Sequence, residues 1–201
     1  MKFDIVRAGQ VDADIREQMA AIFAEGFSQW LVYFSKDPQV IAKAFAHMFV
    51  LDQFYVAMTG DTVAGFAGCT DCIAKSVVLD GRHLRKHLGL IKGSIAALVL
   101  KKEFESPIKD PQPCTGSIEF VGTAAAFRGQ GVASQILRHV IEHTPYETYL
   151  IEEVADTNVP AMSLYQKLGF QEYKSRPIPP KGTKKIGINR FVSFRYTNND
   201  R

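Results

Sequence analysis

Two glycines in a short loop are the clearest sign of chemistry in the sequence. Gly129 and Gly131 lie between a segment rich in β-branched and aromatic residues, 117–123, and a run with helical apolar spacing, 132–143. Glycine has no Cβ and accepts positive φ angles, so consecutive backbone N–H groups of such a loop can point at one centre. The amino terminus of the following helix adds partial positive charge there. The loop is therefore predicted to bind a phosphate group.

The loop differs from two common phosphate-binding motifs. It lacks the Lys-Ser/Thr ending of a P-loop, and its glycines do not have the GxGxxG spacing of a dinucleotide-binding turn. Two glycines are also common in loops for structural reasons, so the loop alone does not indicate a phosphate site. A second motif is needed to support that interpretation. That motif is the segment 158–170, Asn-Val-Pro-Ala-Met-Ser-Leu-Tyr-Gln-Lys-Leu-Gly-Phe, which begins 27 residues after Gly131.

Together the two segments resemble the GNAT superfamily of acyl-CoA-dependent N-acyltransferases. Arg128, Gly131 and Ala133 match its pyrophosphate-loop pattern, Arg/Gln-x-x-Gly-x-Gly/Ala. The later segment matches its pattern Asn-x-x-Ala-x-x-Leu-Tyr-x-Lys-x-Gly-Phe through Asn158, Ala161, Leu164, Tyr165, Lys167, Gly169 and Phe170. The resemblance, closest over 117–170, implies a GNAT fold of the α/β (α+β) class. Its sheet is mixed, mostly antiparallel and six- to seven-stranded, is flanked by helices, and has splayed fourth and fifth strands.

The resemblance also implies acetyl-CoA as the cosubstrate. Backbone groups of Val121 and Thr123 would hydrogen-bond the pantetheine arm as a neighbouring strand would. Asn158 would contact the cofactor near its pantetheine end, and Ala161 is small enough for the arm to pass. Asn158 also fits the role of a helix cap, and the two roles are compatible. The pyrophosphate would be held by backbone amides of Arg128, Gly129, Gln130, Gly131, Val132, Ala133 and Ser134.

Acyl transfer to an amine requires removal of one proton and return of another. An ammonium of the lysine type has a pKa of ~10.4 and must lose its proton before it attacks. By the resemblance, Tyr165 stands beside the CoA sulfur and protonates the departing thiolate, and a strand amide near Val121 stabilises the developing oxyanion. The candidate bases are strand carboxylates. Glu119 and Glu153 rank nearly equal, ahead of Glu152, and water remains open as the base itself.

The surrounding sequence predicts the elements that position these residues. Periodicity and turn residues indicate strands at 3–7, 54–58, 63–69, 117–123, 149–154, 170–176 and 190–197, and helices at 15–27, 38–49, 132–143 and 160–168. One further helical stretch, 79–102, leads into a proline-containing connector. Residues 1–201 are therefore expected to form a single domain with a helical insertion at about 79–115. The aromatic residues of 27–34 fit either plain core or the wall of an apolar pocket.

Composition excludes several classes of protein. The 201 residues are 46% hydrophobic and 22% charged, which is typical of a globular domain rather than a disordered chain or a membrane protein. The net charge of +3 is too small to indicate a nucleic-acid binder. Its positive part lies near the carboxyl end, and the basic loop 174–190 fits either a solvated loop or a site for the cofactor's 3′-phosphate or an acidic acceptor.

The cysteines and histidines do not have metal-site spacing. Cys69 and Cys72 form a CxxC pair, but no second Cys or His pair stands nearby to complete a site. The helical pairs His83/His87 and 139/143 lack the glutamate of an HExxH motif. We therefore expect no metal. The amino terminus has no signal-peptide pattern, which predicts a cytoplasmic protein with reduced thiols.

The prediction is thus an N-acetyltransferase that moves an acetyl group from acetyl-CoA to a primary amine of a small molecule or peptide, by direct transfer in a ternary complex. The alternative is a non-catalytic acyl-CoA-binding sensor or scaffold. The expected partners are acetyl-CoA and an amine acceptor, with no nucleic acid and no membrane, and a homodimer is left open. The aromatic segment 27–34 and the basic loop favour an acceptor with an apolar or anionic portion over a polycation.

Overall fold

A mixed sheet forms the centre of the protein. The computed structural model describes residues 2–106, 108, 112–179 and 187–198. Within them a seven-stranded sheet has the order β1-β2-β3-β4-β5-β7-β6, and its pairs are antiparallel except for the parallel pair β4 and β5. The strands are β1 (Asp4–Arg7), β2 (Phe54–Thr59), β3 (Thr62–Thr70), β4 (Thr115–Thr123), β5 (Thr148–Ala155), β6 (Gln171–Pro177) and β7 (Arg190–Thr197). The predicted sheet is confirmed.

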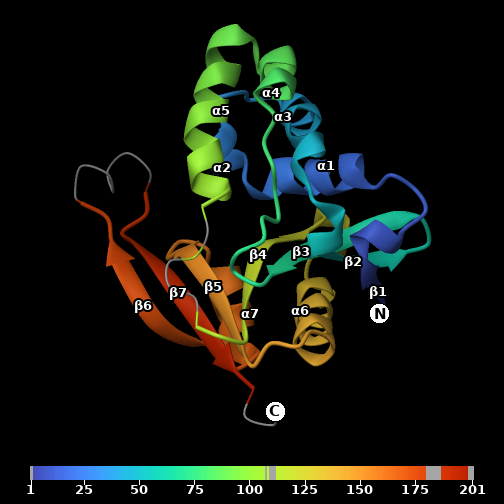
Figure 1. Ribbon diagram of the computed structural model, residues 1–201, viewed down its shortest axis with the longest axis vertical. Helices are drawn as coiled ribbons and strands as arrows, with labels where there is room; N and C mark the ends of the chain where they lie inside the picture. The colour runs from blue at the N-terminus through green and yellow to red at the C-terminus, as the bar shows by residue number, and fades with distance from the viewer. Residues whose placement is uncertain (1, 107, 109–111, 180–186, 199–201) are drawn as a thin grey trace.

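Helices cover both faces of this sheet (Figure 1). One face carries α1 (Arg16–Gly26), α2 (Ser28–Leu31), α3 (Pro38–Phe45), α4 (Gly81–Leu88) and α5 (Leu90–Phe104), and the other carries α6 (Val132–His143) and α7 (Val159–Lys167). Each face has its own apolar cluster. Side chains alternate along a strand, so Val56 packs into the α1 cluster while its neighbours Tyr55 and Ala57 pack into the α6 cluster.

Most predicted elements are confirmed, and a cap residue fixes the start of α3. Asp37 accepts a hydrogen bond from the Gln39 amide at 2.8 Å, with Pro38 as the first helical residue. The predicted helix over 38–49 is shorter, because α3 ends at Phe45 and continues as the 3₁₀ turn Ala46–Met48.

The helical stretch predicted over 79–102 is confirmed, and it consists of two helices. Gly89 has φ +79° and ψ 167°, a backbone conformation that essentially glycine alone adopts, and it divides the stretch into α4 and α5. The two helices form a hairpin that projects from the α1 side of the sheet (Figure 1).

A buried carboxylate joins the two connectors at the base of this hairpin. Glu105 follows α5 and is 8% exposed. It accepts hydrogen bonds from the Leu79 amide at 2.9 Å and from Lys75 Nζ at 2.8 Å. Burial alone raises the pKa of Glu105, but Lys75 and the Leu79 amide outweigh it, so the pKa lies below its usual value. The contact ties the connector between β3 and α4 to the connector between α5 and β4.

Replacing this carboxylate should cost stability in a pH-dependent way. The folded pKa is depressed, so the contribution of Glu105 is present above the unfolded pKa of about 4.3 and is lost as the pH falls through the folded pKa. We expect Glu105→Gln to lower the free energy of unfolding by about 1–2 kcal/mol at pH 7, measured by urea denaturation. The difference from the unmodified protein should shrink below about pH 4. Glu103→Gln, an exposed change on the same helix, is the control. A pH-independent difference would contradict this account.

Candidate active site

The parallel strands β4 and β5 separate after a short pairing. Their register joins Thr115 to Thr148, Gly116 to Tyr149, and Ser117 to Leu150, and the described residues show no pairing beyond this point. β4 continues to pair with β3, and β5 continues to pair with β7. One edge of each strand is therefore left without a strand partner, as the splayed strands of the predicted fold require.

A bulge interrupts each of the separating strands. Phe120 in β4 has φ +50° and Glu153 in β5 has φ +57°, both unusual for residues with a Cβ. The register with β3 shifts beside Phe120, and the register with β7 shifts between Ile151 and Val154. Bulges bend a strand and increase its twist, so these two help to turn the strands apart.

The predicted phosphate loop directly follows the open part of β4. After the 3₁₀ turn Ala125–Phe127, Gly129 has φ +74°, and Gly131 has φ +78° at the start of α6. The Arg128 amide donates to Ala125 O at 3.3 Å and the Gln130 amide to Phe127 O at 3.4 Å. Among the described residues, no acceptor contacts the amides of Gly129, Gly131, Val132, Ala133 and Ser134. These amides are available to an external anion.

Side chains of the loop brace it against the rest of the fold. Arg128 forms an ion pair with Glu25 of α1 at 2.8 Å, and Gln130 Nε2 donates to Ala126 O at 2.9 Å. The Arg128 side chain thus joins the phosphate loop to α1.

Tyr165 lies on α7 within the apolar cluster of the α6 face. Its residue is 5% exposed, and its ring lies 6.1 Å from that of Phe170 and 5.7 Å from that of Phe194. Burial raises the pKa of Tyr165, so the phenol stays protonated at neutral pH. The hydroxyl has no hydrogen-bond partner among the described residues.

Asn158 caps the helix that carries Tyr165, as the sequence predicted. Asn158 Oδ1 accepts a hydrogen bond from the Ala161 amide at 3.3 Å, which confirms its role as a cap. Gly169, with φ +92°, follows the helix at its other end, as predicted. These caps set the bounds of α7 between β5 and β6.

Glu119 lies two residues beyond the last β4 and β5 pair and faces a small pocket. It accepts hydrogen bonds from Ser76 Oγ and, at 3.4 Å, from Thr70 Oγ1. The pocket is lined by Cys72, Ile73, Ala74, Lys75, Ser76, Phe104, Glu105, Ser106, Ile108 and Glu119. The segment before the insertion and the carboxyl end of the insertion therefore form this wall, a role for which the sequence contained no recognisable motif.

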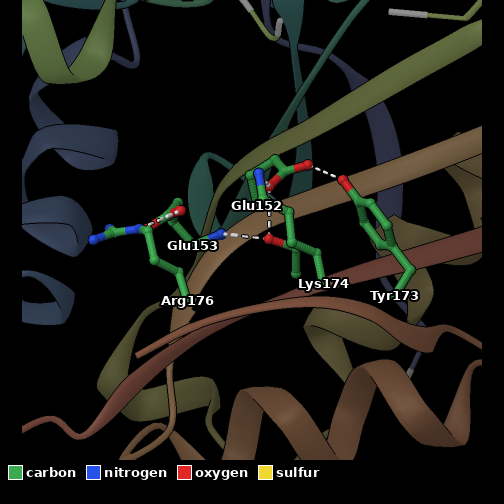
Figure 2. Close-up of polar contacts among 6 residues, drawn as sticks. Glu152, Glu153, Tyr173, Lys174 and Arg176 are labelled. Atoms are coloured by element: carbon green, nitrogen blue, oxygen red, sulfur yellow. Dashed lines mark hydrogen bonds and ion pairs between the residues drawn. The ribbon is translucent and has the colours of Figure 1, made fainter. Parts of the chain in front are cut away.

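The two neighbouring glutamates of β5 have different partners (Figure 2). Glu153 is held by Arg176, which donates from Nε at 3.1 Å and from Nη2. Glu152 accepts from Tyr173 Oη and from Ser193 Oγ at 2.6 Å. Sequence reasoning missed these partners, because they lie on other strands and depend on the strand register.

Part of the aromatic segment 27–34 is confirmed as core. Leu31 and Phe34 are buried in the core. Trp30 is partly exposed, and its ring lies 6.1 Å from Phe191, over which the Arg176 guanidinium lies at 4.9 Å. An aromatic and cationic surface therefore lies beside Glu153. The basic loop prediction cannot be followed further, because Lys181, Lys184 and Lys185 lie outside the described residues.

The thiols are free, and burial raises the pKa of Cys69 to about 12 and of Cys72 to about 11. In the described ranges no group of His, Cys, Asp and Glu is arranged to hold a metal ion. The same ranges contain no helix with the length and apolarity needed to cross a membrane.

Comparison with known proteins agrees with this arrangement. The family model described as the acetyltransferase (GNAT) family matches residues 17–170. The chain belongs to the GNAT acetyltransferase family. The resemblance seen in the sequence is thereby confirmed, and acetyl transfer is the general activity of this GNAT domain.

Solved structures show the same fold. An N-acetyltransferase from Staphylococcus aureus Mu50 is 16% identical, with a TM-score of 0.62, over 96% of this chain and 100% of that chain. A GCN5-related N-acetyltransferase from Kribbella flavida is 20% identical, with a TM-score of 0.54, over 97% of each chain. Comparison with curated proteins gives no significant match. At these identities the likeness concerns the fold and not the acceptor.

Proposed function

We propose that this GNAT domain transfers an acetyl group from acetyl-CoA to a primary amine of a small molecule or peptide, by direct transfer in a ternary complex. The observation that carries the proposal is that an unpaired strand edge is followed along the chain by backbone amides that have no acceptor among the described residues. The strands separate after Ser117 and Leu150, and the loop that follows β4 offers the amides of Gly129 and 131–134 to an anion. A long ligand with a pyrophosphate at one end suits both features.

The open edge of β4 suits the pantetheine arm. The Ala124 amide donates to Ala64 O of β3 at 2.9 Å. Successive backbone groups of a strand point to alternate edges, so those of Thr123 and Val121 are directed to the edge opposite β3. They would bind the amides of the arm, and the Val121 amide would also stabilise the developing oxyanion. Asn158 and Ala161 would border the arm from α7.

Tyr165 is the proposed general acid. The bound thioester supplies an electrophilic acetyl carbon and a thiolate leaving group. Tyr165 is protonated at neutral pH because burial raises its pKa, and its hydroxyl has no competing hydrogen bond among the described residues. It can therefore give its proton to the departing sulfur.

Glu119 is the proposed base, in preference to Glu153. Both carboxylate oxygens of Glu153 already accept hydrogen bonds from Arg176, so an acceptor amine would have to compete with that guanidinium. Glu119 instead accepts from two neutral hydroxyls and faces the pocket. It would take the proton of the acceptor ammonium directly or through water.

The proposed acceptor approaches through the Glu119 pocket. Phe104 and Lys75 line this pocket, and the surface made by Trp30, Phe191 and Arg176 lies on the same side of the sheet as α2. Such walls suit an amine with an apolar or anionic portion. The acceptor class can be tested by comparing turnover on amino acids, peptide amines, polyamines and aminoglycosides.

Removing the phenol should separate catalysis from binding. We expect Tyr165→Phe to lower kcat by about 10²–10⁴-fold, the usual contribution of a general acid. Its ring contacts with Phe170 and Phe194 remain, so the thermal stabilisation by CoA should be unchanged. Release of free thiol from acetyl-CoA measures the rate. An unaltered rate would contradict the role of Tyr165, and binding of CoA without turnover on any acceptor class would favour the sensor or scaffold.

The two candidate bases can be compared directly. We expect Glu119→Gln to lower kcat by about 10²-fold or more and to change the rise of rate with pH. Glu153→Gln should have a smaller effect on kcat, because its carboxylate is occupied by Arg176. If Glu153→Gln lowered kcat more than Glu119→Gln did, and the pH profile of Glu119→Gln were unchanged, Glu153 would be the base instead of Glu119.

A further inference from the structure

The helix α5 is apolar on two opposite sides. Its inner side buries Gly93, Ala96 and Leu100. On its outward-facing surface Leu90 is 76% exposed, Ile91 78%, Leu98 78% and Val99 53%. We call these four residues the α5 ridge. Large apolar side chains that are clustered on a surface are normally covered by a partner. The exposed fractions show that no described residue covers the ridge.

The hairpin that carries this ridge is basic. Residues 81–104, which span both helices, contain six Lys and Arg and one acidic residue, Glu103. Arg82 pairs with Asp80 at 3.0 Å, and Lys92 donates to Phe34 O at 3.2 Å. The other four, which form no ion pair with any described residue, are Arg85, Lys86, Lys101 and Lys102.

We propose that the α5 ridge docks onto a membrane surface that contains anionic lipid. The four apolar side chains would enter the interface between headgroups and acyl chains, while the flanking basic side chains would contact lipid phosphates. Apolar side chains bordered by Lys and Arg are the usual composition of helices that lie on anionic membranes. Long basic side chains can bury their methylene stems and keep their charges at the headgroups.

Charge and shape select this occupant over two others. A second copy docked by two-fold symmetry would bring like charges from both hairpins together, which opposes self-association. The ridge lies on a hairpin that projects from one end of the molecule (Figure 1). A projecting ridge suits a fluid lipid surface, which deforms around it, better than the rigid surface of an acidic protein. Docking of this kind needs no membrane-spanning helix, and it replaces the expectation from the sequence that the protein has no membrane partner.

The hairpin connects the ridge to the Glu119 pocket. Phe104, the last residue of α5, and Glu105 line the Glu119 pocket. One rigid helix therefore connects the ridge to the proposed acceptor entrance. A docked ridge would hold that entrance at a set position relative to the lipid surface.

Vesicle co-sedimentation tests the proposal without any measurement of activity. The intact protein should bind vesicles of equal parts phosphatidylglycerol and phosphatidylcholine, should not bind phosphatidylcholine vesicles, and should dissociate as salt is raised. The double change Ile91→Gln with Leu98→Gln should weaken binding by about tenfold or more. Lys101→Glu with Lys102→Glu should do the same, since each basic residue contributes roughly fivefold.

Matched variants on the opposite face of the sheet are the controls. Val159→Ser removes an apolar side chain that is 65% exposed, and Lys2→Glu with Arg138→Glu reverses two exposed charges. Neither should change vesicle binding. Unaltered thermal unfolding would show that each ridge variant is folded. Failure of the intact protein to bind anionic vesicles, or equal binding by the ridge variants, would overturn the proposal. A dimer in light scattering that the ridge variants abolish would instead assign the ridge to a second copy.

Discussion

The site depends on the early loss of pairing between two parallel strands. An unpaired strand edge exposes N–H and C=O groups, which must bind water, another chain or a ligand. In most sheets this occurs at the outer strands, where it invites aggregation. Here it occurs in the middle of the sheet, between β4 and β5 after Ser117 and Leu150, where flanking helices shelter it. The same region holds the start of α6, whose first amides also lack partners among the described residues.

The two apolar clusters keep this opening from closing. The α1 cluster packs on one face of the sheet and the α6 cluster on the other, so each separating strand is fixed by side chains above and below it. Phe120 of β4 packs against the rings of Phe27 and Phe104, and Val154 of β5 packs against the opposite cluster. Backbone strain at the two bulges is thus offset by burial of neighbouring side chains. Packing on both faces therefore holds the two strands in their separated positions.

Local chemistry explains which features the sequence predicted correctly. Gly131 at positive φ, Asn158 as a cap and Asp37 as a cap each depend on one residue and its immediate neighbours, and all three were predictable. The GNAT resemblance rested on segments of this kind. The mixed, mostly antiparallel sheet and its splayed strands then followed from the family pattern and not from periodicity.

Features that depend on register or on distant packing were not predictable. Phe120 and Glu153 carry no residue-type signal for positive φ, so neither bulge was foreseen. The partners of the β5 glutamates lie 21, 23 and 41 residues away, on strands whose alignment with β5 the sequence does not reveal. Gly89 was visible in the sequence, but a single glycine within a helical pattern is often tolerated, so the break between α4 and α5 was missed.

The most direct test of the central claim is the change in backbone amide NMR shifts when CoA is added to the isotopically labelled protein. The account predicts the largest changes at the amides of Gly129, Gly131 and 132–134, together with Val121 and Thr123 on the open edge of β4. Tight binding of CoA that leaves all of these amides unshifted would contradict it.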